Sequence, residues 1–264
     1  MSAGTDNGLP PRRVVVLGAS NVARSLATVV ETACRLWGRP LDMLLACGHG
    51  RSYGLRMALL WRELPGIVEC GLWEALARRP PVPTAALLTD VGNDLLYDVP
   101  VPDIVAWVEA CLDRLQRAGA RVVLTPLPLC SIAALAPARF LLLRRVLFPG
   151  CRLTYATVMG RAVELDERLR ALAGRRGVQL AEYRPEWYGF DPIHIRRWCW
   201  PLAWREVLSG SPAVSPLPAE APASLRRWLY LRRLAPDRRW IFGRERRTAQ
   251  PAGRLADGTT IALY

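Results

Sequence analysis

The sequence contains no lysine and only two histidines, so its basic character comes almost entirely from arginine. Its 36 arginines outweigh 23 acidic residues and give a formal net charge of +13. A charge of this size is typical of proteins that bind nucleic acid. Here, however, the arginines alternate with acidic residues along predicted helices, as they do on solvent-exposed helix faces. We therefore expect no specific nucleic-acid site and at most a weak attraction to polyanions or anionic membranes.

The chain also lacks any run of about 18 apolar residues, which a membrane-spanning helix requires. No apolar stretch of signal-peptide length precedes the first predicted strand, so we expect a cytoplasmic protein. The seven cysteines are odd in number, and none of them forms a C-x-x-C pair. Most lie in apolar segments, where a free thiol behaves as a small hydrophobic side chain. The pattern favours reduced cysteines and indicates no metal site.

At 264 residues and 51% hydrophobic composition, the chain is long enough for one large α/β domain. Up to residue 209, short apolar runs alternate with segments of helical periodicity. Strands are expected at 13–20, 41–47, 84–90, 120–128 and 178–183. Helices are expected at 21–37, 55–64, 73–79, 102–119, 137–173 (with a break at 149–150) and 200–208. This alternation predicts a flavodoxin-like three-layer α/β/α domain around a mostly parallel five-stranded sheet.

The composition changes after residue 209. A stretch rich in proline, serine and alanine is typical of a linker, and an arginine-rich extension follows it. In the extension, Asp257-Gly258 indicates a hairpin, and LRRWLYLRRL resembles an interfacial membrane helix in composition. For the extension we favour docking on the core, with its arginines in water. The predicted parts are an N-terminal tail at 1–12, the main domain at 13–209, the linker at 210–225 and the extension at 226–264.

Four strand ends carry polar side chains, and in a parallel α/β sheet ligands bind beyond the carboxyl ends of the strands. The first strand leads into Ser20 at the start of a helix, and the second into the glycine-rich loop GHGRSYG. The third leads into TDVGNDL, which contains Asn93, and the fifth into DPIHI, which contains Asp191 and His194. A hydroxyl, a run of backbone N–H groups, an amide, and a carboxylate with an imidazole are the parts of an acyl-transfer site.

With these motifs, residues 13–209 resemble the SGNH hydrolases, the superfamily of GDSL-type esterases and lipases. VVVLGASN resembles the first block of the family, and GHGRSYG resembles its glycine block. TDVGNDL matches the G-x-N-D block and DPIHI the D-x-x-H block, and the four occur in the family order. Each motif alone is short, and their combination at strand ends is what makes the resemblance specific.

The resemblance implies a role for each polar residue. Ser20 corresponds to the nucleophile, His194 to the general base and Asp191 to the partner of that base. The oxyanion hole would consist of the backbone N–H groups of Ser20 and Gly50 and the side chain of Asn93, with Gly48 as the alternative to Gly50. The resemblance implies neither a metal nor a cofactor.

The first block departs from the family at one position. The family usually has Gly-Asp-Ser, and Ala19 stands in the place of this aspartate. The nucleophile is kept, but a carboxylate beside the serine is missing. This departure is the one sequence feature that favours a non-catalytic binding protein with the SGNH fold.

Each motif also has a structural interpretation. Ser20 is a common N-terminal helix cap, and its loop has too few glycines for a dinucleotide-binding loop. Asn93 suits a strand-to-helix turn, while Asp191 and His194 suit an Asx turn at the surface. His49 either shapes the glycine-rich loop or contacts substrate. Four unrelated structural roles at four strand ends are harder to explain than one shared site.

The sequence therefore predicts a serine-dependent ester hydrolase that forms an acyl-enzyme on Ser20 and acts on a small ester or other acylated molecule. The same triad would support an acyltransferase. Two hypotheses from other classes are the non-catalytic binding protein with the SGNH fold and a protein that binds polyanions or anionic lipids through its arginine-rich extension. Tryptophans surround His194 in the sequence, and we expect most to be core residues and one or two to line an acyl pocket. They are Trp187, Trp198, Trp200 and Trp204.

Overall fold

The structure is a computed structural model, and it describes residues 12–59, 61–210 and 225–264. The predicted N-terminal tail and the predicted linker lie almost wholly outside these residues. Within the described part of the chain, no helix is both long and apolar enough to cross a membrane.

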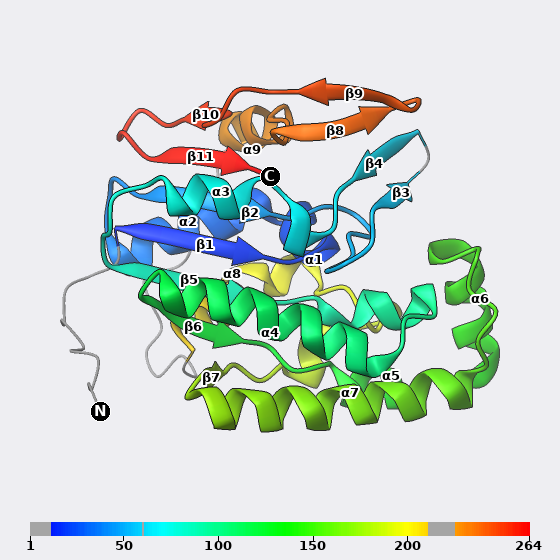
Figure 1. The fold of residues 1–264 in the computed structure, drawn as a ribbon. Helices are drawn as coiled ribbons and strands as arrows, with labels where there is room; N and C mark the ends of the chain where they lie inside the picture. The colour runs from blue at the N-terminus through cyan, green and yellow to red at the C-terminus, as the bar shows by residue number, and fades with distance from the viewer. Residues whose placement is uncertain (1–11, 60, 211–224) are drawn as a thin grey trace.

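A seven-stranded sheet forms the centre of the fold, in the order β10-β11-β2-β1-β5-β6-β7 (Figure 1). All neighbouring strands are parallel except β10 and β11. The strands are β1 (Arg13–Leu17), β2 (Asp42–Ala46), β5 (Thr84–Leu88), β6 (Ala120–Leu124), β7 (Gln179–Leu180), β10 (Gly253–Arg254) and β11 (Thr260–Leu263). The central strands β1 and β5 are buried over their whole length, which explains why they are continuous apolar runs without polar alternation.

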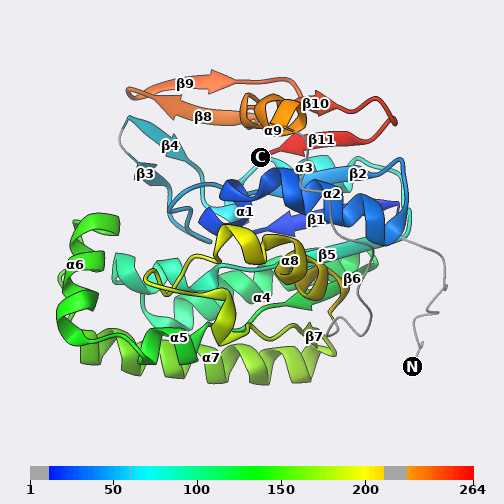
Figure 2. The ribbon, with the colours of Figure 1, turned by 180° about the vertical axis from the view of Figure 1, so that it is seen from behind.

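Helices cover both faces of this sheet, as the two opposite views show (Figures 1 and 2). One layer contains α1 (Ser20–Arg24), α2 (Leu26–Trp37), α8 (Trp200–Ser209) and α9 (Leu225–Arg232). The other contains α3 (Leu72–Ala77), α4 (Val101–Arg117) and α7 (Tyr155–Arg176). Each layer packs its own hydrophobic cluster against the sheet. The predicted three-layer α/β/α fold is confirmed.

The predicted number of five strands is wrong, because the C-terminal segment adds β10 and β11 to the central sheet. β11 pairs in parallel with β2, and Ile261 lies beside Met43. The end of the segment predicted as an extension, from β10 to β11, is therefore part of the main sheet. The hairpin predicted at Asp257-Gly258 is confirmed, since this turn joins β10 to β11 and Gly258 has a φ of 87°. Pairing between strands so far apart leaves no trace in local periodicity.

The helix predicted at 55–64 is wrong, because this range contains two strands. Its strands β3 (Met57–Leu59) and β4 (Arg62–Leu64) pair antiparallel. β4 also pairs with β8, so that β3, β4, β8 and β9 form a second sheet. These partner strands are β8 (Arg238–Ile241) and β9 (Arg244–Arg247). The local pattern of 55–64 suits a helix, but pairing with the C-terminal segment outweighs it.

The remaining elements follow the prediction with shifted limits. The helix predicted at 21–37 is divided at Ser25 into α1 and α2, and the one at 137–173 forms α6 and α7. The additional elements are α5 (Leu129–Ala133), α6 (Pro137–Leu147) and the short 3-10 helices η1 (Ile67–Glu69), η2 (Val91–Tyr97), η3 (Pro185–Trp187) and η4 (Arg197–Cys199). All seven cysteines are free, and of these only Cys130 is exposed.

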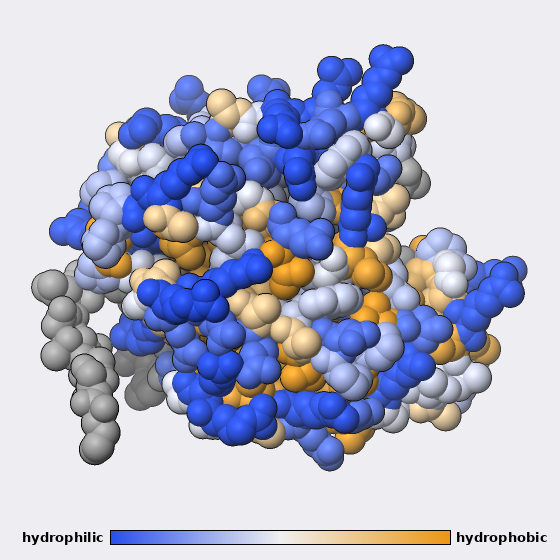
Figure 3. Space-filling view, viewed as in Figure 1, coloured by the Kyte–Doolittle hydropathy of each residue, from blue (hydrophilic) through white to orange (hydrophobic). Residues whose placement is uncertain are grey.

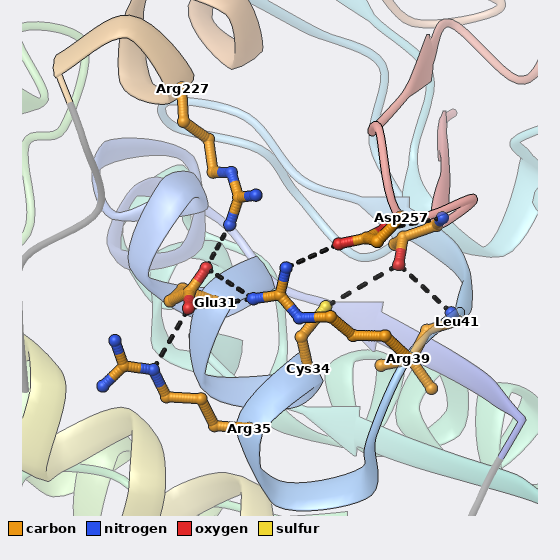
Figure 4. Close-up of polar contacts among 8 residues, drawn as sticks. Glu31, Cys34, Arg35, Arg39, Leu41, Arg227 and Asp257 are labelled. Carbon is orange, nitrogen blue, oxygen red and sulfur yellow. Dashed lines mark hydrogen bonds and ion pairs between the residues drawn. The ribbon is translucent and has the colours of Figure 1, made fainter. Parts of the chain in front are cut away.

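Charged groups attach the C-terminal segment to α2 (Figure 4). Glu31 of α2 accepts hydrogen bonds from Arg35, Arg39 and Arg227, and Arg227 belongs to α9. Arg39 also donates to Asp257 in the β10–β11 turn, at 2.5 Å. Burial alone would raise the pKa of Glu31, but the three guanidinium groups lower it below its usual value. From the sequence we expect the arginines of this segment to lie in water. Arg227 differs from this expectation, because it binds Glu31 and helps to hold α9 against α2.

If β11 completes the hydrophobic core, shortening its buried side chain should destabilise the whole fold. Ile261 has no exposed surface, so Ile261→Ala is expected to lower the free energy of unfolding by about 2–5 kcal/mol. The measurement is urea unfolding followed by tryptophan fluorescence. Leu229→Ala is the control on α9, because Leu229 is 44% exposed and a surface change costs within about 0.5 kcal/mol. Equal midpoints for the two variants would show that β11 is not part of the core.

Candidate active site

Three of the predicted loops meet at the carboxyl end of the central sheet. Ser20 begins α1 directly after β1, and η2, which carries Asn93, follows β5. The segment between η3 and η4 carries Asp191 and His194 and lies against the start of α1. The parallel sheet is what brings these segments together, because all its strand ends face the same edge.

Ser20, His194 and Asp191 form a continuous hydrogen-bonded chain. Ser20 Oγ lies 2.8 Å from His194 Nε2, and His194 Nδ1 lies 2.5 Å from Asp191 Oδ2. Only about a tenth of the His194 side chain is exposed, and Ser20 is almost buried. His194 Nε2 can therefore accept the proton of the serine hydroxyl while Nδ1 donates its proton to the carboxylate.

Asp191 is held in place by its own loop as well as by His194. Its other oxygen, Oδ1, accepts the N–H groups of Ile193 and His194 at 3.1 and 3.3 Å. Burial raises the pKa of Asp191, but the hydrogen bond and charge of His194, together with these N–H groups, lower it below its usual value. The Asx turn proposed as an alternative is present, and it serves to orient the carboxylate toward the imidazole.

Of the residues predicted for the oxyanion hole, Ser20 and Asn93 line the same pocket. Within the described residues, no hydrogen bond is made by the Ser20 N–H. The Asn93 side chain lines the same pocket as Ser20 and donates a long hydrogen bond, 3.4 Å, to the carbonyl of Arg51. Gly50 precedes Arg51, has a φ of 63° and accepts a hydrogen bond from Tyr97 at 2.6 Å. These contacts fix the glycine-rich loop against η2, next to Asn93.

Comparison with known proteins gives likenesses of structure alone. A scan of protein-family models finds no match, and a search of curated proteins finds none. Among solved structures, the psychrotrophic esterase EstA from Pseudoalteromonas sp. matches with a TM-score of 0.47 at 14% identity, over 75% of this chain and 96% of that one. AlinE4, an SGNH-hydrolase family esterase, matches with a TM-score of 0.42 at 19% identity, over 64% and 75%. A further solved chain reaches a TM-score of 0.50 at 15% identity, over 75% and 94%.

The three-layer fold of the described residues is the one that the resemblance to the SGNH hydrolases implies. The order of the strands, the four motifs at their carboxyl ends and the hydrogen-bonded chain of Ser20, His194 and Asp191 agree with this assignment. At these identities the likeness concerns the fold, and the chemistry has to be argued from the residues of this chain.

Asp90 supplies the carboxylate that the SGNH motif lacks at Ala19. Its Oδ2 accepts the backbone N–H groups of Ala19 and Asn21 at 2.9 and 3.1 Å, so it binds on both sides of Ser20. Its Oδ1 accepts Asn21 Nδ2 at 2.8 Å. Asp90 belongs to none of the predicted site residues, and its only signal in the sequence is an acidic residue after a buried strand. What the sequence does not show is its left-handed backbone, with a φ of 59°, a conformation that non-glycine residues adopt rarely and that aspartate and asparagine adopt more often than most.

Asn21 connects this carboxylate to the loop of the histidine. Its Nδ2 donates to the Ile193 carbonyl at 2.8 Å, and its Oδ1 accepts the N–H of Ile195 at 2.9 Å. The side chain thus bonds the residues on either side of His194. Asp90 and Asn21 together fix the backbone on both sides of Ser20 and of His194, which sets the distance between the hydroxyl and the imidazole.

Asp94 of η2 holds the glycine-rich loop through a hydrogen bond to its backbone. It is fully buried, and its Oδ2 accepts the N–H of Tyr53 at 2.9 Å. Burial raises the pKa of Asp94 to about 6, although hydrogen bonds from Ser52 and Tyr53 oppose the shift. A carboxyl group with such a pKa makes the folding of this loop sensitive to weakly acidic pH.

The pocket beside Ser20 is lined by other residues than the sequence suggests. None of the four tryptophans near His194 contributes to its wall. Trp187 and Trp204 are buried in the core, and Trp198 is 75% exposed. The expectation that one or two of them line an acyl pocket is therefore wrong. His49 lies in the glycine-rich loop and is exposed. Its pKa is lowered mainly by desolvation and, to a smaller extent, by the charge of nearby His194.

Removing the Asp90 carboxylate should reduce the reactivity of Ser20. Asp90→Ala leaves the N–H groups of Ala19 and Asn21 without their acceptor, and a shift of the serine by about 1 Å can cost about 10²-fold in rate. In Asp90→Asn the asparagine can adopt the left-handed backbone and keeps one acceptor oxygen. The labelling rate of Ser20 should therefore fall less than in Asp90→Ala. The measurement is the rate at which a fluorophosphonate labels Ser20 in folded protein. Labelling of Asp90→Ala at the wild-type rate would refute this role.

The raised pKa of Asp94 predicts a specific pH dependence of stability. The native carboxyl keeps its proton up to about pH 6, and 3.8 is its ordinary value. Its contribution is therefore fully present below pH 4 and is lost as pH rises through 6, a change of about 3 kcal/mol. The difference in unfolding free energy between wild type and Asp94→Asn, from urea titrations at pH 4 to 7, should show this fall. Asp103→Asn, at an exposed position of α4, is the control, and a flat difference for Asp94→Asn would contradict the prediction.

Proposed function

We propose that the protein is a serine-dependent hydrolase of carboxylic esters. The observation that carries this proposal is the chain of hydrogen bonds from Ser20 Oγ to His194 Nε2 and from His194 Nδ1 to Asp191. Such a chain gives the serine hydroxyl a base within reach and gives that base a fixed tautomer. The position of Ser20 at the start of α1 adds the partial positive charge of a helix N-terminus.

The reaction would proceed in two steps. Ser20 Oγ attacks the ester carbonyl carbon while His194 Nε2 accepts the hydroxyl proton, and Asp191 stabilises the imidazolium that results. The tetrahedral intermediate collapses when His194 returns this proton to the departing alcohol, which leaves an acyl group on Ser20. Water then attacks the acyl-enzyme with the same base, and the carboxylic acid is released.

The negative charge on the tetrahedral intermediate needs donors in place before the reaction. The Ser20 N–H makes no other hydrogen bond among the described residues, and the Asn93 side chain lines the same pocket. The Gly50 N–H is the third proposed donor, with Gly48 as the alternative. Loss of one such donor typically lowers turnover by about 10²–10³.

Two alternatives to the hydrolase are a non-catalytic binding protein and an acyltransferase. A non-catalytic binding protein was suggested by the missing aspartate at position 19, and the carboxylate of Asp90 weakens that reason. An acyltransferase would use the same acyl-enzyme with an acceptor other than water. Product analysis distinguishes it from a hydrolase, because added alcohol would appear in the product as a new ester.

The proposal is tested with p-nitrophenyl butyrate and three variants. Ser20→Ala and His194→Ala should lower kcat by about 10⁴–10⁶, because members of such a triad act as a unit, and Asp191→Ala should lower it somewhat less. Ser131→Ala, at a serine of α5 outside the wall of the pocket beside Ser20, is the control and should keep full activity. Ser20 should also gain the mass of a fluorophosphonate adduct. Wild type that neither turns over nor is labelled would refute the hydrolase and leave the binding protein.

A further inference from the structure

An apolar pocket extends from Ser20 into the layer formed by α5, α6 and α7. It is a narrow recess, with a cavity volume of about 100 Å³. Its wall includes Leu95 of η2, Leu127 after β6, Phe140 of α6 and Val158 of α7. On the face seen in Figure 3, the surface is hollowed between the β3–β4 hairpin and α6, and hydrophobic residues line the hollow.

The wall of this pocket is held by contacts that do not involve the triad. The ring of Phe140 packs edge-on against Tyr155, with the centroids 5.3 Å apart, and Phe148 packs in the same way against Tyr97 at 5.5 Å. The backbone N–H of Leu127 donates to Asp166 of α7 at 2.8 Å. The pocket is therefore part of the folded structure and needs no ligand to form it.

The polar groups of the pocket are not spread evenly. Ser20, Asn21, Asp90 and Asn93 all lie at the end where the reaction would take place. Most of the remaining wall consists of leucine, isoleucine, valine, proline and phenylalanine side chains. Its other polar groups are Tyr183, whose hydroxyl bonds Thr89 and Thr125, Tyr188, and Arg144, which directs its guanidinium to the Leu153 carbonyl. A wall of this kind gives favourable free energy to hydrocarbon and leaves a polar substituent unpaired.

We propose that this pocket binds the acyl chain of the substrate and that the chain is an unbranched hydrocarbon of medium length. The assignment rests on the proposed function, because the ester carbonyl has to lie at Ser20. The acyl group is the part that stays bonded to Ser20 while the alcohol leaves and water enters. A recess that continues from Ser20 suits the part that stays, and the alcohol then lies toward the opening.

The test compares chain length in the two halves of the ester. In wild type, kcat/KM should rise about fourfold per methylene from p-nitrophenyl acetate to the octanoate, since each CH₂ moves from water into the apolar pocket. A series of alkyl acetates that lengthens the alcohol should show no such rise. Octanoate itself should bind to wild type in calorimetry, and acetate should not.

Two variants fill the pocket and one controls for the added bulk. Ala162→Phe places a ring in the wall from α7, and Leu96→Trp does so from η2 at a half-buried position where overpacking is more easily relieved. Both should abolish the rise with chain length and the binding of octanoate. Ala171→Phe adds the same ring at an exposed position of α7 and should behave as wild type.

The outcomes separate this inference from the proposed function. Turnover that does not depend on acyl length, or that still rises in folded Ala162→Phe and Leu96→Trp, would overturn the acyl pocket and leave the hydrolase intact. A rise that follows the alcohol chain would also overturn it. If wild type is inert and unlabelled, but binds octanoate and loses this binding in both filling variants, the hydrocarbon pocket stands and the hydrolase fails.

Discussion

Ser20 and His194 are 174 residues apart in the chain, and a single hydrogen bond of 2.8 Å joins their side chains. The proposed hydrolase activity depends on that distance, because a hydroxyl that does not reach a base is only a poor nucleophile. The distance is set by the sheet. β1 delivers Ser20 to its carboxyl edge, and the segment that follows β7 returns to the same edge from the far side of β5 and β6.

A sheet edge alone does not hold two side chains within hydrogen-bond distance, and here a polar network refines their positions. Asp90 bonds the N–H groups on both sides of Ser20, and Asn21 bonds the backbone on both sides of His194. Asp90 and Asn21 also bond each other. The network connects three segments without using the reacting atoms, so the hydroxyl and the imidazole remain free to exchange a proton. It also explains how an SGNH fold can have alanine in front of its serine.

The C-terminal segment has a structural role that its arginine content conceals. It contributes β11 to the central sheet and β8 and β9 to the second one, and the ion pairs of Glu31 fasten α9 to α2. The planar guanidinium of arginine can donate to several acceptors at once. A chain without lysine can therefore form many contacts of this kind. The high net charge is thus compatible with an ordinary folded domain and does not by itself indicate a polyanion partner.

The sequence by itself determined the three-layer fold, the five original strands, and Ser20, Asn93, Asp191 and His194 as the residues that share a site. This was possible because apolar runs and polar strand ends are local features, and because parallel strands present their ends at one edge. Only the tertiary structure decided that residues 55–64 pair as strands, that β11 joins β2, and that Asp90 replaces the carboxylate missing at position 19. Each of these depends on contacts between distant segments or on a left-handed backbone, and neither leaves a signature in the local sequence. The leucines and phenylalanines that line the apolar pocket could not be predicted from the sequence either, because the same residue types also fill a close-packed core.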